Sequence, residues 1–139
     1  MMSGELLAEA ATRPEIVFGA GLPGFPGARR FVLEPWGAPD GPFWLMSCRE
    51  DPDLAFVLVI PWVFFPDYDF ELDPTTIARL GVQDPTDVLV YSVVTLGDRP
   101  EDATANLLGP IVVNRNTHEA VQAVLARSDY EARTPIARA

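Results

Sequence analysis

The most informative pattern in the chain is a stretch of seven residues, 67–73, in which acidic and apolar side chains alternate without a break. A period of two is what a β-strand with one wet face and one buried face requires. In an extended chain the acids project from one face about 7 Å apart, and the apolar side chains point into a core. The acids are Asp67, Asp69, Glu71 and Asp73, and the apolar residues are Tyr68, Phe70 and Leu72.

Such a row of carboxylates lies harmlessly in solvent, forms a docking surface for a basic protein, or holds a metal ion. Neighbouring acids repel each other by roughly 0.6 kcal/mol even at the dielectric constant of water, a cost that the fold must offset. A helix-loop-helix calcium loop starting at Asp67 would need glycine at its sixth position and glutamate at its twelfth. Those positions hold Leu72 and Ala78. We therefore expect no metal ligand in this row.

Short runs rich in β-branched and aromatic residues recur along the rest of the chain, separated by glycine and proline. Such runs are typical of strands, and the separators are typical of loops and turns. Residues 120–126 fit either a helix or the return strand of a hairpin. We predict a strand there, because a short turn follows a strongly β segment. The other strands are expected at residues 15–19, 30–34, 42–47, 54–60, 87–96, 105–108 and 109–114.

One segment has the signals of a short helix. Asp73 can cap it, Pro74 suits a first helical position, and Gly81 ends it. The sum is a mainly all-β fold of about eight short strands with one short helix, which is an antiparallel barrel or sandwich.

The length of 139 residues fits one domain. We expect a flexible N-terminal extension at residues 1–13, a single domain at 14–130 and a flexible C-terminal tail at 131–139. The N-terminal residues have no basic leader and carry acids within their apolar run, which predicts a cytoplasmic protein. The longest apolar run, 54–65, is too short and too interrupted by Pro61 to cross a membrane as a helix.

Charge restricts the class of partner. The net charge is −10 and the pI is near 4.3, with ten arginines and no lysine. Phosphate backbones repel such a surface, so we expect no direct nucleic-acid binding and partners that are basic or neutral.

Candidate catalytic chemistry is sparse. Cys48 lies in an apolar run and is expected to be a buried small hydrophobe, and His118 lies in a predicted turn, where histidine is usually exposed. One cysteine and one histidine cannot supply the four ligands of a structural zinc site. A phosphate-binding P-loop is impossible without lysine. Twenty acids are enough to form a pair of catalytic carboxylates, but no motif singles one out. We expect no catalytic residue, no cofactor and no metal.

Beside the acidic residues lies a dense apolar cluster, more aromatic than one layer of a small barrel readily buries. Core packing explains most of its members, and one or two of them fit exposed anchors for a partner. Asn106 fits either a turn residue or a polar contact. The cluster comprises Pro61, Trp62, Phe64 and Phe65.

Four blocks in order, at residues 21–25, 54–72, 87–96 and 106–114, make the chain resemble the flagellar assembly factor FliW family. They read GLPGF, LAFVLVIPWVFFPDYDFEL, DVLVYSVVTL and NLLGPIVVN. The resemblance runs from about Ile16 to Leu125 and implies a small antiparallel β-barrel, in agreement with the strand count. Pro66 departs from the family pattern, in which a polar residue is commoner at this position. A proline removes a backbone donor there and fixes the chain beside the acids.

The resemblance implies a cytoplasmic, non-enzymatic protein that is a monomer when free and binds either flagellin or the RNA-binding translational regulator CsrA. Flagellin held in the cell would occupy it and leave CsrA free to repress flagellin translation. Export of flagellin would release it to bind CsrA away from the RNA-binding surface and relieve repression. The alternative function is a small-ligand-binding or metal-binding barrel, with or without enzymatic activity. The residues expected to bind partners are Pro61, Trp62, Phe64, Phe65, Asp67, Asp69, Glu71, Asp73 and Asn106.

Overall fold

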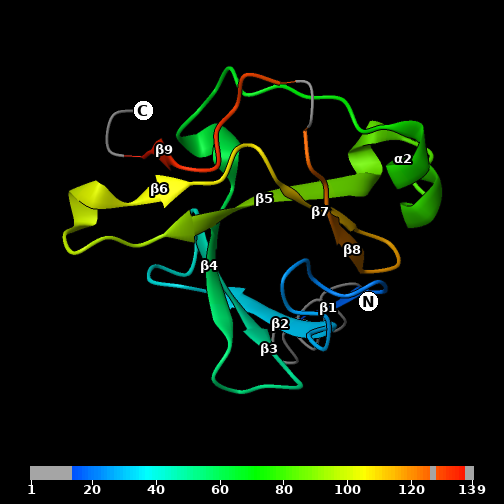
Figure 1. Ribbon diagram of the computed structural model, residues 1–139, viewed down its shortest axis with the longest axis horizontal. Coiled ribbons are helices and arrows are strands. Elements are labelled where there is room, and N and C mark those ends of the chain that lie inside the picture. The colour runs from blue at the N-terminus through cyan, green and yellow to red at the C-terminus, as the bar shows by residue number, and fades with distance from the viewer. Residues whose placement is uncertain (1–13, 126–127, 137–139) are drawn as a thin grey trace, which may run out of the picture.

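The computed structural model describes residues 14–125 and 128–136, and its main feature is a closed barrel (Figure 1). Seven strands in the order β4-β3-β2-β1-β8-β7-β5 form the wall, and pairing of β4 with β5 closes it. Two further strands, β6 and β9, extend the sheet beyond β5. The strands are β1 (Glu15–Phe18), β2 (Arg30–Pro35), β3 (Phe43–Cys48), β4 (Ala55–Val59), β5 (Val88–Thr95), β6 (Thr104–Ala105), β7 (Ile111–Asn114), β8 (Glu119–Gln122) and β9 (Thr134–Pro135).

This architecture confirms the predicted fold class. Of the two alternatives that the sequence left undecided, a barrel and a sandwich, the structure is the barrel. The neighbouring strands pair antiparallel, with one departure from the prediction. β1 and β8 run parallel, with Val17 opposite Glu119 and Phe18 opposite Ala120. This parallel pair places β1, the first barrel strand along the chain, beside β8, the last of the seven barrel strands, and so contributes to the closure of the barrel.

The barrel interior is filled by alternate residues of the strands, as a period of two requires. On β2, Phe31 and Leu33 are buried, whereas Arg30 is exposed. The buried interior cluster is Ile16, Phe18, Leu22, Ala28, Phe31, Leu33, Met46, Cys48, Leu58, Tyr91, Ile111, Val113 and Ala120.

A second core lies on the outside of the wall. Val59 and Val94 face away from the interior cluster. They are covered by Tyr68, by Leu107 and by Ile136, which belongs to the C-terminal segment, residues 128–136. Because this outer core needs a cover, the chain after β4 does not return directly to the sheet. It passes through the 3₁₀ helix η1 (Pro61–Val63) and crosses the top of the barrel to the helix α2 (Pro74–Leu80) (Figure 1).

α2 confirms the predicted helix and both of its ends. Asp73 Oδ1 accepts a hydrogen bond from Thr76 N at 2.7 Å, Pro74 occupies the first turn, and Gly81 takes a left-handed conformation with φ of 68°. The buried Leu80 anchors the helix on β7, where the Asn114 Nδ2 donates to the Leu80 carbonyl at 2.7 Å.

The hairpin prediction for residues 120–126 is confirmed for its first half, since β8 pairs antiparallel with β7. The predicted strand at 105–108 is wrong after Ala105. There the Asn106 Oδ1 accepts from Leu108 N at 3.1 Å and from Gly109 N at 2.9 Å, which turns the chain. As expected, Cys48 is buried and His118 is exposed.

Of the two predicted terminal segments, the structure describes only part of the C-terminal one. The predicted extension at residues 1–13 lies outside the described residues. Part of the predicted tail at 131–139 is described: β9 pairs with β6, and Ile136 is 8% exposed in the outer core.

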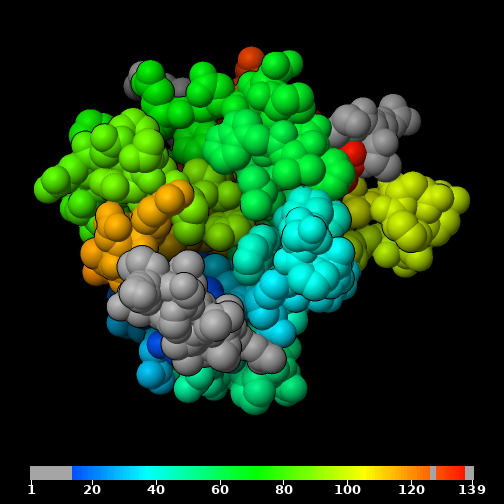
Figure 2. Space-filling model, turned by 180° about the vertical axis from the view of Figure 1, so that it is seen from behind, coloured from blue at the N-terminus to red at the C-terminus, as the bar shows by residue number. Residues whose placement is uncertain are grey.

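Two further 3₁₀ helices, η2 (Pro85–Asp87) and η3 (Pro100–Asp102), flank β5. The connection that contains η3 projects from the side of the barrel (Figures 1 and 2).

Candidate functional site

The acidic segment, residues 67–73, lies on the surface where it crosses the outer core. Its alternation of side chains is confirmed: the four acids are exposed, Tyr68 is 4% exposed, and Phe70 and Leu72 are partly buried. The segment nevertheless forms no strand, so the strand-like pattern of its side chains is not accompanied by backbone pairing. A strand requires a neighbour to pair with. Here β4 pairs with β5 instead, so the barrel is already closed beneath the segment, and none of the described strands pairs with it.

At the start of the segment, side chains make the hydrogen bonds to the backbone that a neighbouring strand would otherwise make. The Trp62 Nε1 donates to the Tyr68 carbonyl at 2.6 Å, and the Asp69 backbone N–H donates to the Tyr130 hydroxyl at 2.9 Å. The Tyr68 hydroxyl donates to the Leu107 carbonyl at 2.7 Å. These three bonds fix the first half of the acidic segment to the barrel and to the C-terminal segment.

Ring packing supports the same half. The Tyr68 ring centroid lies 4.7 Å from that of Tyr130, 5.3 Å from that of Phe70 and 5.7 Å from that of Trp62. Burial among these rings raises the pKa of the Tyr68 hydroxyl well above its usual range, and the nearby Tyr130 raises it further. Tyr68 therefore stays protonated and acts as a structural donor.

Two grooves flank the acidic segment, and residues 69–72 line both. The first has a volume of about 600 Å³ and lies between the segment and the chain after β8. Its far wall includes Ala123 and the 65% exposed Val124. The second, of about 530 Å³, lies between the segment, α2 and β5, and is lined largely by apolar side chains. Among them are Trp62, Ile77, Val82, Val88 and Val90.

The predicted aromatic cluster divides between core and surface. Pro61 is buried, and Phe64 and Phe65 pack partly buried against the outer core. Trp62 is 39% exposed, and its ring stacks on Phe70 with an interplanar angle of 18°. Of this cluster, Trp62 therefore offers the most accessible aromatic surface beside the acids.

Asn106 lies in the turn after β6, where its side-chain oxygen accepts the two turn hydrogen bonds given above. The structure therefore accounts for this residue by turn geometry, and its role as a partner contact stays a prediction. Residues that the sequence analysis did not single out as contacts also border the grooves, notably Ile77, Val124 and Ser128. Ile77 and Val124 occupy apolar positions of predicted elements, and nothing in a pattern of period two or 3.6 indicates that such positions are exposed.

The acids of the segment differ in their surroundings. The Thr76 backbone N–H, which donates to Asp73, is the main cause that lowers the pKa of that carboxyl, and the Thr76 side chain contributes in the same direction. Within residues 14–125 and 128–136, no ion pair involves an acid of the segment. Nor does any group of three or more histidine, cysteine, aspartate or glutamate side chains in this part of the chain form a metal-binding cluster.

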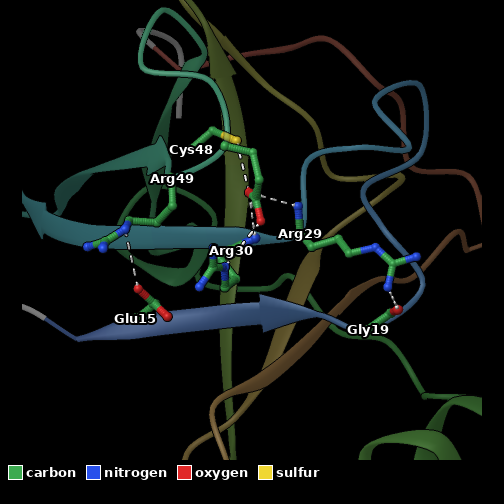
Figure 3. A network of polar contacts seen from close by, with 7 residues as sticks. Glu15, Gly19, Arg29, Arg30, Cys48 and Arg49 are labelled. Atoms are coloured by element: carbon green, nitrogen blue, oxygen red, sulfur yellow. Dashed lines mark hydrogen bonds and ion pairs between the residues drawn. The ribbon is translucent and has the colours of Figure 1, made fainter.

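By contrast, several arginines are held at the opposite end of the barrel in a polar network (Figure 3). The Glu50 carboxylate accepts from the backbone N–H of Arg30 at 3.1 Å and of Arg29 at 3.3 Å, and it pairs with the Arg30 Nε at 3.2 Å. The backbone N–H of Arg30 is the main cause that lowers the pKa of Glu50 to about 2. Arg49 pairs with Glu15 at 3.7 Å. Arg30 and Arg49 are therefore paired with acids at this end, whereas the Arg29 guanidinium donates to the Gly19 carbonyl at 3.1 Å.

Comparisons with known proteins agree on one family. The family model described as FliW protein matches residues 3–136. The flagellar assembly factor FliW of Bacillus licheniformis is 43% identical over 121 residues, which are 87% of this chain and 84% of the relative. That of Bacillus subtilis is 40% identical over the same shares. A crystal structure of the flagellar assembly factor FliW superposes with a TM-score of 0.83 at 33% identity, covering 88% of this chain and 84% of that one.

Proposed function

Because the chain belongs to the FliW family, whose members are named flagellar assembly factors, we propose that it binds flagellin and the translational regulator CsrA through the acidic segment. The two partners bind one at a time. Flagellin that has not been exported occupies the protein and leaves CsrA free to repress flagellin translation. Export of flagellin releases the protein to bind CsrA, which relieves the repression.

The observation that carries this proposal is the exposure of the carboxylates between two grooves. Asp69 and Glu71 are exposed, and within the described part of the chain neither has an ion-pair partner. An unpaired anionic row on a protein of net charge −10 attracts a basic partner over roughly a Debye length of 8 Å and orients it. CsrA must carry basic charge because it binds RNA, and the acidic segment attracts such a partner even where the docking surface lies away from the RNA-binding surface.

The apolar side of the interface is expected at Trp62. Tryptophan is among the residues most enriched at interface hot spots, and Trp62 is held in place by its own hydrogen bond to Tyr68. A partner that covers the remaining exposed part of this ring gains apolar burial without ordering a new side chain.

The role is that of a protein-binding factor in the cytoplasm, with no catalytic turnover. The relatives are named as assembly factors and not as enzymes. In the described part of the chain, no helix is both long enough and apolar enough to span a membrane.

Isothermal titration of the purified protein with its cognate flagellin and, separately, with CsrA tests the proposal. The variant D69K/E71K reverses two charges of the acidic segment and is expected to weaken CsrA binding by about tenfold or more. The matched control is D98K/E101K, which makes the same change in net charge on the projecting connection between β5 and β6, where both acids are exposed. Its affinity is expected to stay within about twofold of the wild type.

Each outcome is decisive. Binding of the folded protein to neither partner rejects the proposed role. Equal losses in D69K/E71K and D98K/E101K mean that net charge alone drives binding, and they reject the acidic segment as the site.

A further inference from the structure

The acidic segment has an unpaired backbone edge. No backbone hydrogen bond joins residues 70–72 to any described residue. The side chains of residues 67–73 nevertheless alternate between exposed and at least partly buried, as they do in a strand. A row of unpaired N–H and C=O groups at the surface is a template for pairing with another extended chain. The segment therefore has the side-chain alternation of a strand and, among the described residues, no strand that pairs with it.

The directions of the backbone groups indicate which groove is available. In an extended chain, the N–H and C=O of successive residues point to opposite sides, so those of alternate residues share a side. The N–H of Asp69 points to Tyr130 in the C-terminal segment, as their 2.9 Å hydrogen bond requires. The N–H and C=O of Glu71 and the N–H of Asp73 are therefore expected to face the same side as Tyr130. The groove on this side is the one lined by Ser128, whose hydroxyl accepts from Tyr130 N at 3.3 Å, and by Ala123 and Val124.

We propose that this groove binds an extended basic segment of a partner protein, which adds to the acidic segment as a β-strand with arginine or lysine at alternate positions. The proposal rests on the proposed function, because it names the form in which a basic partner is held at the same segment. It concerns the backbone, however, and can fail while the proposed function stands.

Charge and side-chain spacing select this occupant. Side chains on one face of a strand lie about 7 Å apart, so alternate basic residues of the added strand would lie opposite the exposed carboxylates of Asp69, Glu71 and Asp73. The intervening side chains would point down onto the apolar part of the groove, where Leu72 and Val124 lie. A helix could not pair with the open backbone groups, because its own N–H and C=O groups are already satisfied. A second copy of this acidic chain is disfavoured by repulsion.

The test uses the full chain labelled with ¹⁵N and a seven-residue peptide of alternating arginine and valine with blocked ends. In the complex, the amides of Glu71 and Asp73 are expected to exchange with solvent at least about fivefold more slowly, while those of Phe70 and Leu72 keep their rates. Two N-methylated peptides serve as matched ligands. Methylation of one alternate set of peptide amides should abolish binding, and methylation of the other set should preserve it.

Several results would overturn the inference. One is binding of the peptide with unchanged exchange at Glu71 and Asp73, and another is equal binding of the two N-methylated peptides. Protection of Glu71 in the free protein would mean that another part of this chain already fills the groove. Failure of the peptide to bind, with CsrA or flagellin still binding in the titration above, would reject strand addition and leave the proposed function intact.

Discussion

Tyr68→Phe removes one hydroxyl from beneath the acidic segment and leaves the ring in place. The lost hydrogen bond, 2.7 Å from the Tyr68 hydroxyl to the Leu107 carbonyl, joins two residues that are each 4% exposed. Water cannot readily replace the donor, so the carbonyl is left without this partner. We expect the free energy of unfolding to fall by about 1–3 kcal/mol, and Tm to fall by roughly 3–12 °C in a chain of this size.

The same substitution changes the alkaline side of the stability profile. Burial raises the pKa of Tyr68 in the folded state above the ordinary value of 10.0. Above pH 10 the unfolded chain therefore releases this proton while the folded chain keeps it, and stability falls with rising pH. Each such tyrosine contributes a slope of about 1.4 kcal/mol per pH unit, so the slope of Tyr68→Phe should be shallower by about that amount. Tyr91, whose pKa burial also raises, maintains the remaining slope.

Urea denaturation followed by tryptophan fluorescence, at pH 7 and between pH 9 and 11, measures both effects. Tyr130→Phe is the matched control, because its hydroxyl accepts from the N–H of the exposed Asp69, which water can satisfy. Its loss should stay below about 1 kcal/mol. A loss in Tyr68→Phe no larger than in Tyr130→Phe, or an unchanged alkaline slope, would refute the argument from burial.

Two further predictions concern the helix beside the site. The Thr76 backbone N–H lowers the pKa of Asp73, so the stabilising contribution of this carboxyl is present above about pH 4 and is lost as the pH falls below that value. Asp73→Asn, which caps a helix without titrating, should flatten the Tm profile between pH 4 and pH 2, and an unchanged profile would contradict the assignment. Asn114→Leu removes a 3% exposed side chain that donates to the Leu80 carbonyl at 2.7 Å and accepts from Asn116 N at 2.8 Å. It should lower the free energy of unfolding in urea by about 2–4 kcal/mol, against less than about 1 kcal/mol for Asn116→Ala on the exposed side of the same turn, and similar losses in the two variants would exclude the buried bond as the cause.

Local rules predicted the elements that local interactions determine. The cap at Asp73, the proline after it and the glycine at 81 act within one helix, and the structure has each of them where the sequence places it. The hairpin of β7 and β8 is likewise set by a short turn between two apolar runs. In both cases the residues that decide the structure lie within a few positions of each other.

The acidic segment shows where this kind of reasoning ends. Alternation correctly predicted which side chains are buried, because burial depends on the face that each side chain occupies. It could not predict a ladder, because pairing depends on whether another strand lies alongside, and here β4 and β5 pair with each other beneath the segment. The contribution of Tyr130, which lies 61 positions from Asp69 in the chain, has no local signal at all.

The parallel contact of β1 with β8 also determines when the molecule can be completed. Val17 pairs with Glu119, so the chain must grow by 102 residues, 119 minus 17, before that contact can form. A ribosome adding 5–20 residues per second needs about 5–20 s for this. During that time the edge of β1 that pairs with β8 in the folded protein stays unpaired. Tyr130 is made later still, so the acidic segment receives this support only after the whole barrel has been synthesised. A nascent chain is therefore expected to reach its binding-competent form only after Tyr130 has been made.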